Sequence, residues 1–395
     1  MSDHNRRSVK AIHTSVFLFS LSFGFVSFIL PIYSKELGAS ALEIGGLFSI
    51  LTITTLIFRP VTGWALDRFG RKPFLVFGLL LLSCSRFIYV FADSISVLYL
   101  ARFITGISTL FLSVSVLTIV SDLANPTERG KEMGKIGQVL ARSSILGVFF
   151  GFSLFGFLQP TKAWQGAFLG YTAMALIAVW LAWHNVQETK PKIVEQKYQH
   201  QVKSIISIPL LKLMFIVFVT GTSTSMLAPI YLIFLQDKFT TDVGLLALAF
   251  LPGGLVVAFF AARLGNLSDL YGRISLMVIG FISAGILSLL IPHIPSLIWL
   301  TVLFALSNVA GAMSSPAQSA MVADIAGDDR RGKSYGLHDF SMNLGITIGP
   351  LLGGWMYDTI GKSSPFYLNG VILLFCGTWV LLFMRHPKHQ KVWLQ

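Results

Sequence analysis

Charge is scarce in this sequence. Only 12% of its 395 residues are Asp, Glu, Lys or Arg, whereas 54% are apolar, and the mean hydropathy is +0.72. Soluble proteins carry about 25% charged residues, with which they cover their surface. The shortage of charge therefore argues against a water-soluble enzyme or a nucleic-acid-binding domain. Because one helix crosses a bilayer in about 20 apolar residues, the apolar residues suffice for about twelve spans and leave little for a soluble domain.

Residues that would indicate disulfides, metal binding or catalysis are also few. Cys84 and Cys376 fall inside long apolar runs and predict no disulfide framework. The sequence contains no H-E-x-x-H, G-x-S-x-G or Walker pattern, and the adjacent His338 and Asp339 have no third metal ligand nearby. We therefore expect no enzyme, no cofactor, no metal and no process driven by ATP. A receptor or a structural protein remains an alternative at this point.

Long apolar runs bounded by charges or by Gly and Pro clusters predict twelve membrane-spanning helices, and hence an all-α membrane protein. The expected spans are residues 11–33, 42–65, 73–92, 96–121, 134–158, 165–186, 208–235, 243–264, 274–293, 296–322, 335–358 and 364–384. The polar segment Glu188–Lys203 divides them six and six. This division predicts an N-terminal bundle of residues 1–186, a solvated cytoplasmic linker of residues 187–207 and a C-terminal bundle of residues 208–395.

The net charge of +12 and the pI near 9.7 would suggest a nucleic-acid partner in a soluble chain. Here 20 of the 30 Lys and Arg residues fall in the loops and tails on one side of the predicted spans. The opposite loops hold only Lys35, Lys162, Lys238 and Lys362. Basic residues concentrate in cytoplasmic loops, so we expect a multi-pass protein of the cell membrane with both termini in the cytoplasm. The positive charge then marks topology and predicts no nucleic-acid partner.

The two halves repeat each other at an offset of 202 residues. Gly63, Asp67, Gly70 and Arg71 recur as Gly265, Asp269, Gly272 and Arg273; Asp122 and Arg129 recur as Asp324 and Arg331; Gly147 and Gly151 recur as Gly349 and Gly353. One register that holds at three separate sites indicates an internal duplication, which is typical of membrane transporters.

The pattern Gly-x-x-x-Asp-Arg-x-Gly-Arg-Lys at residues 63–72 resembles the signature loop of the major facilitator superfamily of transporters, and the resemblance covers the whole chain. Residues 98–106, which contain Arg102, resemble a second motif of the proton-linked members. Pro31 and the Leu-Gly-Ala-Ser of residues 37–40 resemble the twelve-span drug:proton antiporter branch. The resemblance implies the major facilitator fold, in which two pseudo-symmetric six-helix bundles line a central cavity.

A glycine motif that the drug antiporters carry in span five occurs here in the repeat-equivalent span eleven, and its displacement counts against an exporter. The motif consists of Gly336, Gly345, Gly349, Pro350, Gly353 and Gly354. Glycines spaced by four let helices approach closely in lipid, whereas Pro350 removes one backbone hydrogen bond and permits a kink. The motif therefore predicts either a tight helix crossing or a bending point.

The repeated loops predict a gate. Its candidate residues are Gly63, Asp67, Gly70, Arg71, Asp122, Arg129, Asp269, Gly272 and Arg273. A carboxylate such as Asp67 is favoured beside the positive N-terminal end of a neighbouring helix, and the resemblance implies such a latch between the two halves. Asp122 is the expected partner of Arg71. These contacts require a shut cytoplasmic side, so the loop is predicted to lock an outward-open state; alternatively, it only orients the helices.

Ionisable groups inside spans are costly and usually face a cavity. The candidates for a substrate or proton pathway are Arg102, Arg142, His338, Asp339 and Asn343. Arg102 fits the motif of the proton-linked members, whereas Arg142 either pairs structurally or binds a ligand. Asp339, with His338 as helper, is the proton carrier that we predict. A helix cap at the cytoplasmic end is the alternative role for Asp339.

These features favour a secondary active transporter that moves a small amphipathic or lipophilic organic molecule by alternating access, with proton-coupled, multidrug-type efflux as the expected reaction. The alternative is a carrier for an organic anion or lipid-like substrate that Arg102 and Arg142 clamp. The expected partners are the small-molecule substrate, a proton as the coupling ion and the lipid bilayer. We expect the protein to act as a monomer.

Overall fold

A computed structural model describes residues 3–125, 128–155, 157–190, 207–326 and 331–383. Within these ranges the chain folds into α-helices, one short 3-10 helix and connecting loops, without a β-strand. The elements are α1 (Asp3–Glu36), α2 (Ala41–Phe69), α3 (Arg71–Val90), α4 (Ile95–Leu123), α5 (Arg129–Phe155), α6 (Pro160–Asn185), α7 (Ile208–Lys238), α8 (Val243–Tyr271), α9 (Arg273–Leu290), η1 (Ile291–His293), α10 (Leu297–Ala326), α11 (Arg331–Thr359) and α12 (Ser364–Phe383). The predicted all-α fold class is confirmed.

Ten of the helices in the described part of the chain are long and apolar enough to cross a membrane. The two others are α8, whose apolar described stretch is Val243–Val256, and α11. The first turns of α11 carry Lys333, His338 and Asp339, which lower its hydropathy. In the repeat, α8 corresponds to α2 and α11 corresponds to α5. Helices α2 and α5 both qualify as membrane spans. The helices are thus consistent with the twelve predicted spans.

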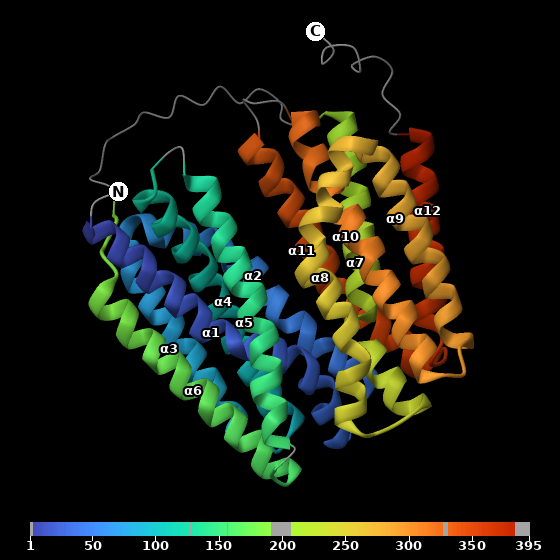
Figure 1. The fold of residues 1–395 in the computed structure, drawn as a ribbon, viewed down its shortest axis with the longest axis horizontal. Helices are drawn as coiled ribbons and strands as arrows, with labels where there is room; N and C mark the ends of the chain where they lie inside the picture. Colours follow the sequence, from blue (N-terminus) through green and yellow to red (C-terminus); the bar gives the residue numbers. More distant parts are fainter. Residues whose placement is uncertain (1–2, 126–127, 156, 191–206, 327–330, 384–395) are drawn as a thin grey trace. The chain divides into compact units, whose positions relative to one another are not determined.

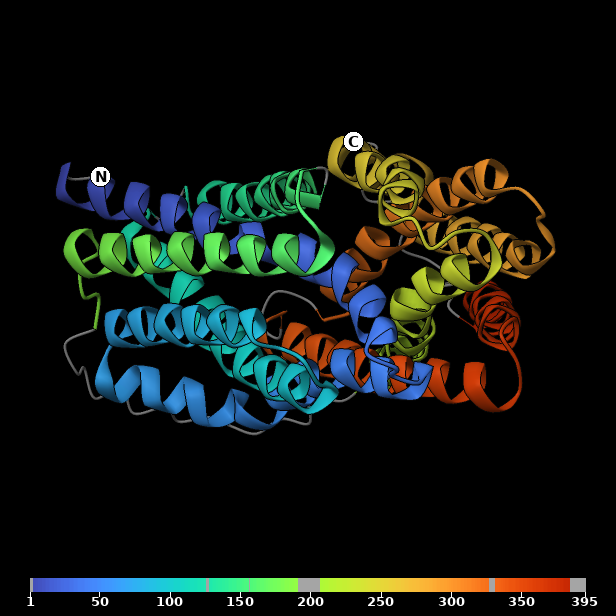
Figure 2. The ribbon, with the colours of Figure 1, turned by 90° about the horizontal axis from the view of Figure 1, so that it is seen from below.

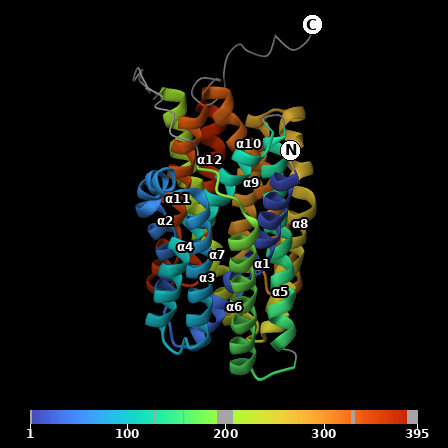
Figure 3. The same cartoon turned by 90° about the vertical axis from the view of Figure 1, so that its left-hand side faces the viewer.

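The chain forms two compact units, Met1–Gln199 and His200–Gln395. Most of the predicted linker, residues 191–206, lies outside the described residues. In the first unit α3 packs against α4 and α6, α1 packs against α5 and α6, and α2 packs against α4 (Figures 1 and 3). Figure 2 shows α1 and α6 running side by side over much of their length.

The second unit repeats this packing. Its α9 packs against α10 and α12, α7 packs against α11 and α12, and α8 packs against α10 (Figure 1). Each of these pairs is the counterpart of a pair in the first unit when α1 to α6 are matched to α7 to α12. The duplication that the sequence indicates is therefore also a duplication of helix packing.

Glycines permit a close crossing of α5 with α1 in the first unit. A Cβ atom at Gly147 would collide with the carbonyl oxygen of Leu21, and one at Gly151 would collide with the ring of Phe25. Gly24 makes the reciprocal approach from α1 to the backbone of α5. Lipid supplies no hydrophobic drive between helices, so close packing of this kind is what holds them together.

The equivalent crossing of α11 with α7 uses the glycine motif of the predicted span eleven. Cβ atoms at Gly345, Gly349 and Gly353 would each collide with the backbone of α7. By contrast, an added Cβ at Gly336 has no neighbouring atom within 4 Å. The three glycines at spacing four therefore form the crossing, and Gly336 lies outside it.

Replacing Gly349 with alanine should destabilise the protein by about 1–3 kcal/mol, because the added methyl group overlaps the backbone of α7. Gly336→Ala is the matched control on the same helix. It adds a methyl group in open space and raises helix propensity by about 1 kcal/mol, so this variant should be at least as stable as the wild type. Thermal unfolding of the purified proteins in detergent compares the two. Equal unfolding temperatures for both variants would contradict the close crossing.

Candidate functional site

The repeated loop of each unit is a one-residue connection between two helices. In the first unit α2 ends at Phe69 and α3 begins at Arg71, and Gly70 lies between them with φ +101°. In the second unit Gly272 separates α8 from α9 with φ +86°. Residues with a Cβ atom rarely adopt such positive φ values. Glycine is therefore required at both positions for the helices to follow one another so directly.

The arginine after each turn pairs with an aspartate near the end of another helix of the same unit. Arg71 Nε lies 3.5 Å from Asp122 Oδ2 on α4, so the expected partner is the one observed. Arg273 Nε lies 2.9 Å from Asp324 Oδ2 on α10. The two pairs differ in burial, since the Arg71 side chain is 6% exposed and the Arg273 side chain 28% exposed. Each ion pair joins the start of one helix to the end of the next.

The remaining predicted gate residues are less constrained by the structure. Gly63 lies within α2, and no atom lies within 4 Å of a Cβ added there. Arg129 is exposed at the start of α5. The side chains of Asp67 and Asp269 lie outside the described residues. The latch expected for Asp67 therefore stays a prediction.

A segment that the sequence pattern assigns to a solvated linker lies against the same loop. Glu188, Thr189 and Lys190 form hydrogen bonds with α3, α4 and α2, respectively. The sequence does indicate that α3 needs an acceptor from elsewhere in the chain. A helix that follows Gly70 directly has no N-cap side chain to satisfy its first N–H groups. The residue that supplies the missing acceptor is 117 positions away. Only the fold could identify it.

Two arginines are buried inside the first unit. Arg86 on α3 is 1% exposed and donates hydrogen bonds to Ser22 Oγ at 2.8 Å and Thr105 Oγ1 at 3.3 Å, so it braces α1, α3 and α4. Arg102 on α4 is 5% exposed, and its guanidinium lies 4.9 Å from the centre of the Phe48 ring. Its Nε and Nη2 atoms have no hydrogen-bond partner among the described residues. A buried donor group of this kind is suited to an anionic partner.

The surroundings of Arg142 are different. This residue is exposed on α5, whereas Arg102 is buried against α2. The two arginines of the predicted anion clamp are thus unequal.

The polar stripe of α11 is held by its own helix. Asn343 Nδ2 donates to the carbonyl oxygen of Asp339 at 2.7 Å, and Thr347 Oγ1 donates to that of Asn343 at 2.8 Å. His338 Nδ1 lies 3.6 Å from Asp339 Oδ1; the imidazole is mostly buried and the carboxylate is half exposed. Pro350 follows inside the same helix. His338 and Asp339, the predicted proton carrier and its helper, therefore lie on the helix whose glycines pack against α7.

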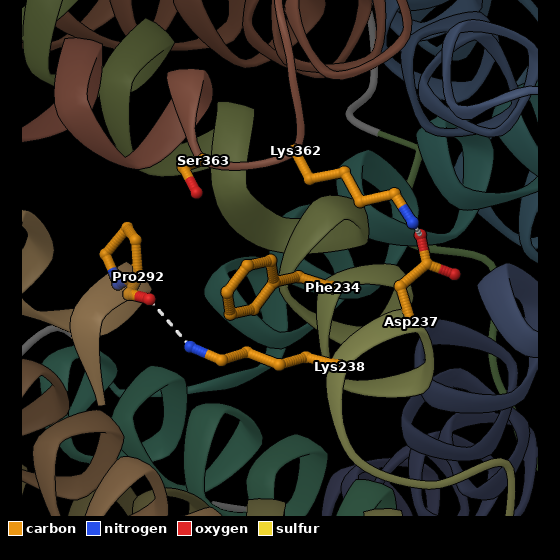
Figure 4. A pocket seen from close by; sticks show the side chains of 6 residues that line it. All are labelled: Phe234, Asp237, Lys238, Pro292, Lys362 and Ser363. Atoms are coloured by element: carbon orange, nitrogen blue, oxygen red, sulfur yellow. Dashed lines mark hydrogen bonds and ion pairs between the residues drawn. The ribbon is translucent and has the colours of Figure 1, made fainter. Parts of the chain in front are cut away.

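A cavity of about 220 Å³ lies at the end of α7 in the second unit. It is lined by Phe234, Asp237, Lys238, Pro292, Lys362 and Ser363 (Figure 4). Asp237 Oδ2 pairs with Lys362 Nζ at 2.8 Å, and Lys238 Nζ donates to the carbonyl oxygen of Pro292 at 2.6 Å. The charged groups on its wall are thus engaged with one another or with the backbone. None of the predicted site residues lines it, and the described residues contain no group of three His, Cys, Asp or Glu side chains that could hold a metal.

Comparisons with known proteins match the chain over nearly its whole length. The sequence profile of the Major Facilitator Superfamily matches residues 12–212 and again residues 213–393. The chain is 26% identical over 382 residues to multidrug resistance protein 1 of Bacillus subtilis, with 96% of each chain covered. It is 23% identical over 389 residues to quinolone resistance protein NorA of Staphylococcus aureus, with 98% of each covered. A crystal structure of a peptide transporter (POT) in complex with sulfate superposes with a TM-score of 0.78 at 12% identity, covering 95% of this chain and 94% of that one.

The unequal burial of the two ion pairs leads to a test. Asp122→Ala should destabilise the protein by about 1–3 kcal/mol, because it removes the carboxylate that forms an ion pair with the buried guanidinium of Arg71 and accepts a hydrogen bond from Thr189. Asp324→Ala is the repeat-equivalent control, and it should cost less than about 1 kcal/mol because the Arg273 pair is more exposed to water. Thermal unfolding of both variants in detergent measures the difference. A cost at Asp324 as large as that at Asp122 would show that burial does not distinguish the pairs.

Proposed function

The chain belongs to the Major Facilitator Superfamily of membrane transporters, and we propose that it exports small amphipathic or lipophilic organic molecules across the cell membrane in exchange for protons. The observation that carries this proposal is the similarity to two drug-resistance proteins over nearly the full chain. The duplicated helix packing and the paired loop charges add support, since they are the parts that an alternating-access transporter needs. We place both termini in the cytoplasm and take the monomer as the working unit.

The gating step in this proposal uses the two repeated loops. Each ion pair, Arg71 with Asp122 and Arg273 with Asp324, ties the start of one helix to the end of another within its own unit. Each unit can then move as a rigid body, because its loop does not deform independently of its helices. The positive-inside distribution assigns both loops to the cytoplasmic side. The loops thus belong to the face that must close when the transporter opens outward.

The coupling step needs groups that gain and lose a proton. No ATP-binding pattern occurs in the sequence, so the proposed energy source is the proton gradient. His338 and Asp339 adjoin on α11, and Asn343 lies one turn further along the same face. The half-exposed carboxylate can exchange protons with water, and the mostly buried imidazole can stabilise its charge. On the first unit, Arg102 is a buried cationic group that could interact with the substrate.

An organic anion is the second candidate substrate. It is favoured by the buried Nε and Nη2 atoms of Arg102, which have no hydrogen-bond partner among the described residues. A carboxylate or phosphate would satisfy both atoms with charge-assisted hydrogen bonds. Arg142 on α5 is the candidate for a second contact.

Transport of ethidium by purified protein in liposomes tests the main proposal. Under an imposed pH gradient the wild type should move ethidium against its gradient, and a protonophore should abolish this movement. Asp339→Asn should lower the rate by about 100-fold or more, since an amide cannot carry the proton and the loss of one acid–base group typically costs that much. Asp358→Asn, an exposed carboxylate further along the same helix, should leave the rate unchanged.

Two results would overturn this scheme. An ethidium transport rate that does not depend on the pH gradient would contradict proton coupling. Transport of an organic anion but not of ethidium, reduced by Arg102→Ala, would favour the second candidate instead.

A further inference from the structure

The first residues after α6 wrap onto the α2–α3 turn. Glu188 Oε1 accepts a hydrogen bond from the backbone N–H of Arg71 at 2.8 Å, and Glu188 Oε2 accepts one from that of Lys72 at 3.2 Å. Glu188 Oε1 also accepts from the backbone N–H of Lys190 at 2.9 Å, which folds the segment around the carboxylate. One side chain thus takes up two N–H groups at the start of α3.

These two N–H groups need an acceptor from outside the helix. The first four N–H groups of an α-helix have no partner within it, and the residue before α3 is Gly70, which has no side chain to act as a cap. The helix N-terminus also carries a partial positive charge that favours a carboxylate. Glu188 satisfies both needs at once, from 117 residues away.

Gly70 leaves the space that this carboxylate occupies. A Cβ atom at Gly70 would collide with Glu188 Oε2, whereas a Cβ atom at Gly272 in the second unit would meet only Ser275 Oγ at 4.0 Å. Both glycines have a positive φ. Gly70 is therefore constrained twice, by its backbone angle and by Glu188, and Gly272 only by its backbone angle.

The next two residues reach the other helices of the gate. Thr189 Oγ1 donates to Asp122 Oδ2 at 2.9 Å, and this is the oxygen that Arg71 Nε approaches. Lys190 Nζ donates at 2.6 Å to the carbonyl oxygen of Arg68, in the last turn of α2. An ammonium is favoured at a helix C-terminus for the same reason that a carboxylate is favoured at an N-terminus. Glu188 and Lys190 therefore place opposite charges on the two helix ends that meet at the turn, and Thr189 contacts the end of α4.

The approach of this segment is fixed by the residues before it. Val186 is buried, and the backbone N–H of Gln187 donates to Ser8 Oγ on α1 at 3.3 Å. Ser8 Oγ in turn donates to the carbonyl oxygen of Asn185 at 3.0 Å. The residues just before Glu188 are thus held against α1, which fixes the position from which its carboxylate reaches α3.

The second half of the sequence has no carboxylate at the equivalent place. The position 202 residues after Glu188 is Gln390, and residues 384–395 contain no Asp or Glu. The N-cap residue of α9, Gly272, provides no side-chain hydrogen bond to that helix. The carboxylate at this position is therefore a feature of the first half of the sequence that the duplication does not explain.

We infer that Glu188, Thr189 and Lys190 form a clasp that holds Arg71 in register with Asp122, and that Glu188 is a positioning residue for the gate. The clasp joins the ends of α2, α3 and α4 at one point. Without the carboxylate, the first turn of α3 frays. The backbone of Arg71 is then no longer held in place, so its side chain is no longer positioned beside Asp122. The consequence for transport rests on the function proposed above; the structural clasp does not.

Hydrogen exchange tests the clasp without any substrate. In full-length protein in detergent, Glu188→Ala should speed exchange in peptides covering the first turn of α3 about fivefold, the effect of losing one helix cap. Peptides covering the first turn of α9 should be unchanged. Glu128→Ala, which removes another exposed carboxylate of the first unit, one that accepts from Asn125, is the control and should leave α3 unchanged. Equal exchange at α3 in wild type and Glu188→Ala overturns the clasp.

A double-mutant comparison tests the steric part of the contact. Gly70→Ala should lower the unfolding temperature more than Gly272→Ala does in the wild-type background, because it adds a collision to the strain of the backbone angle. In the Glu188→Ala background the collision is absent, so the two alanine substitutions should then have the same effect. Additive effects of Gly70→Ala and Glu188→Ala would overturn the contact.

Ethidium transport separates a positioning role from a merely local cap. Glu188→Ala should lower the maximal rate about fivefold with KM unchanged, because Glu188 is expected to touch no substrate. Glu188→Gln retains one acceptor oxygen and should give an intermediate rate. A normal maximal rate in Glu188→Ala despite faster exchange at α3 overturns the positioning role. If the wild type itself fails to move ethidium, the proposed function fails, while the exchange and unfolding comparisons still decide the clasp.

Discussion

Close backbone contact between α1 and α5, and between α7 and α11, is the constraint on which the rest of this structure depends. In a bilayer, apolar side chains gain nothing by leaving lipid for another helix, so association requires shape and contact. Gly147 and Gly151 supply that contact in the first unit, and Gly345, Gly349 and Gly353 supply it in the second. The crossing in the second unit also fixes the face on which α11 carries His338 and Asp339. The glycine crossing thus helps to orient the helix that carries the proposed coupling residues.

The charged residues of the chain fall into two groups. Those repeated in both halves stabilise the architecture that the halves share, whereas the unrepeated ones are candidates for a specific function. Charge pairs that recur at the 202-residue offset, such as Arg71 with Asp122, hold helix ends together in both units. Unrepeated polar residues occur where the two units must differ. Glu188 contacts the turn of the first unit, and in the sequence neither this carboxylate nor the His338–Asp339 pair recurs at the 202-residue offset.

Much of this could be predicted because it depends on local sequence. The helices follow from apolar runs, the repeat follows from spacing, and the partnership of Arg71 with Asp122 follows from a motif that the repeat displays twice. Contacts that depend on the packed fold could not be predicted. Glu188 lies in a polar run that resembles any solvated linker, and its partner helix begins 117 residues earlier. Similarly, composition gives no means of distinguishing the exposed Arg142 from the buried Arg102, because burial depends on which face of each helix meets a neighbour.

Proton exchange is the central claim of this account, and proton movement measures it most directly. Purified protein in liposomes that enclose a pH-sensitive dye, with no imposed gradient, should move protons across the membrane when ethidium is added to one side. The direction should be opposite to that of ethidium, and a protonophore should dissipate the resulting pH change. Ethidium transport with no accompanying change in internal pH would contradict the account.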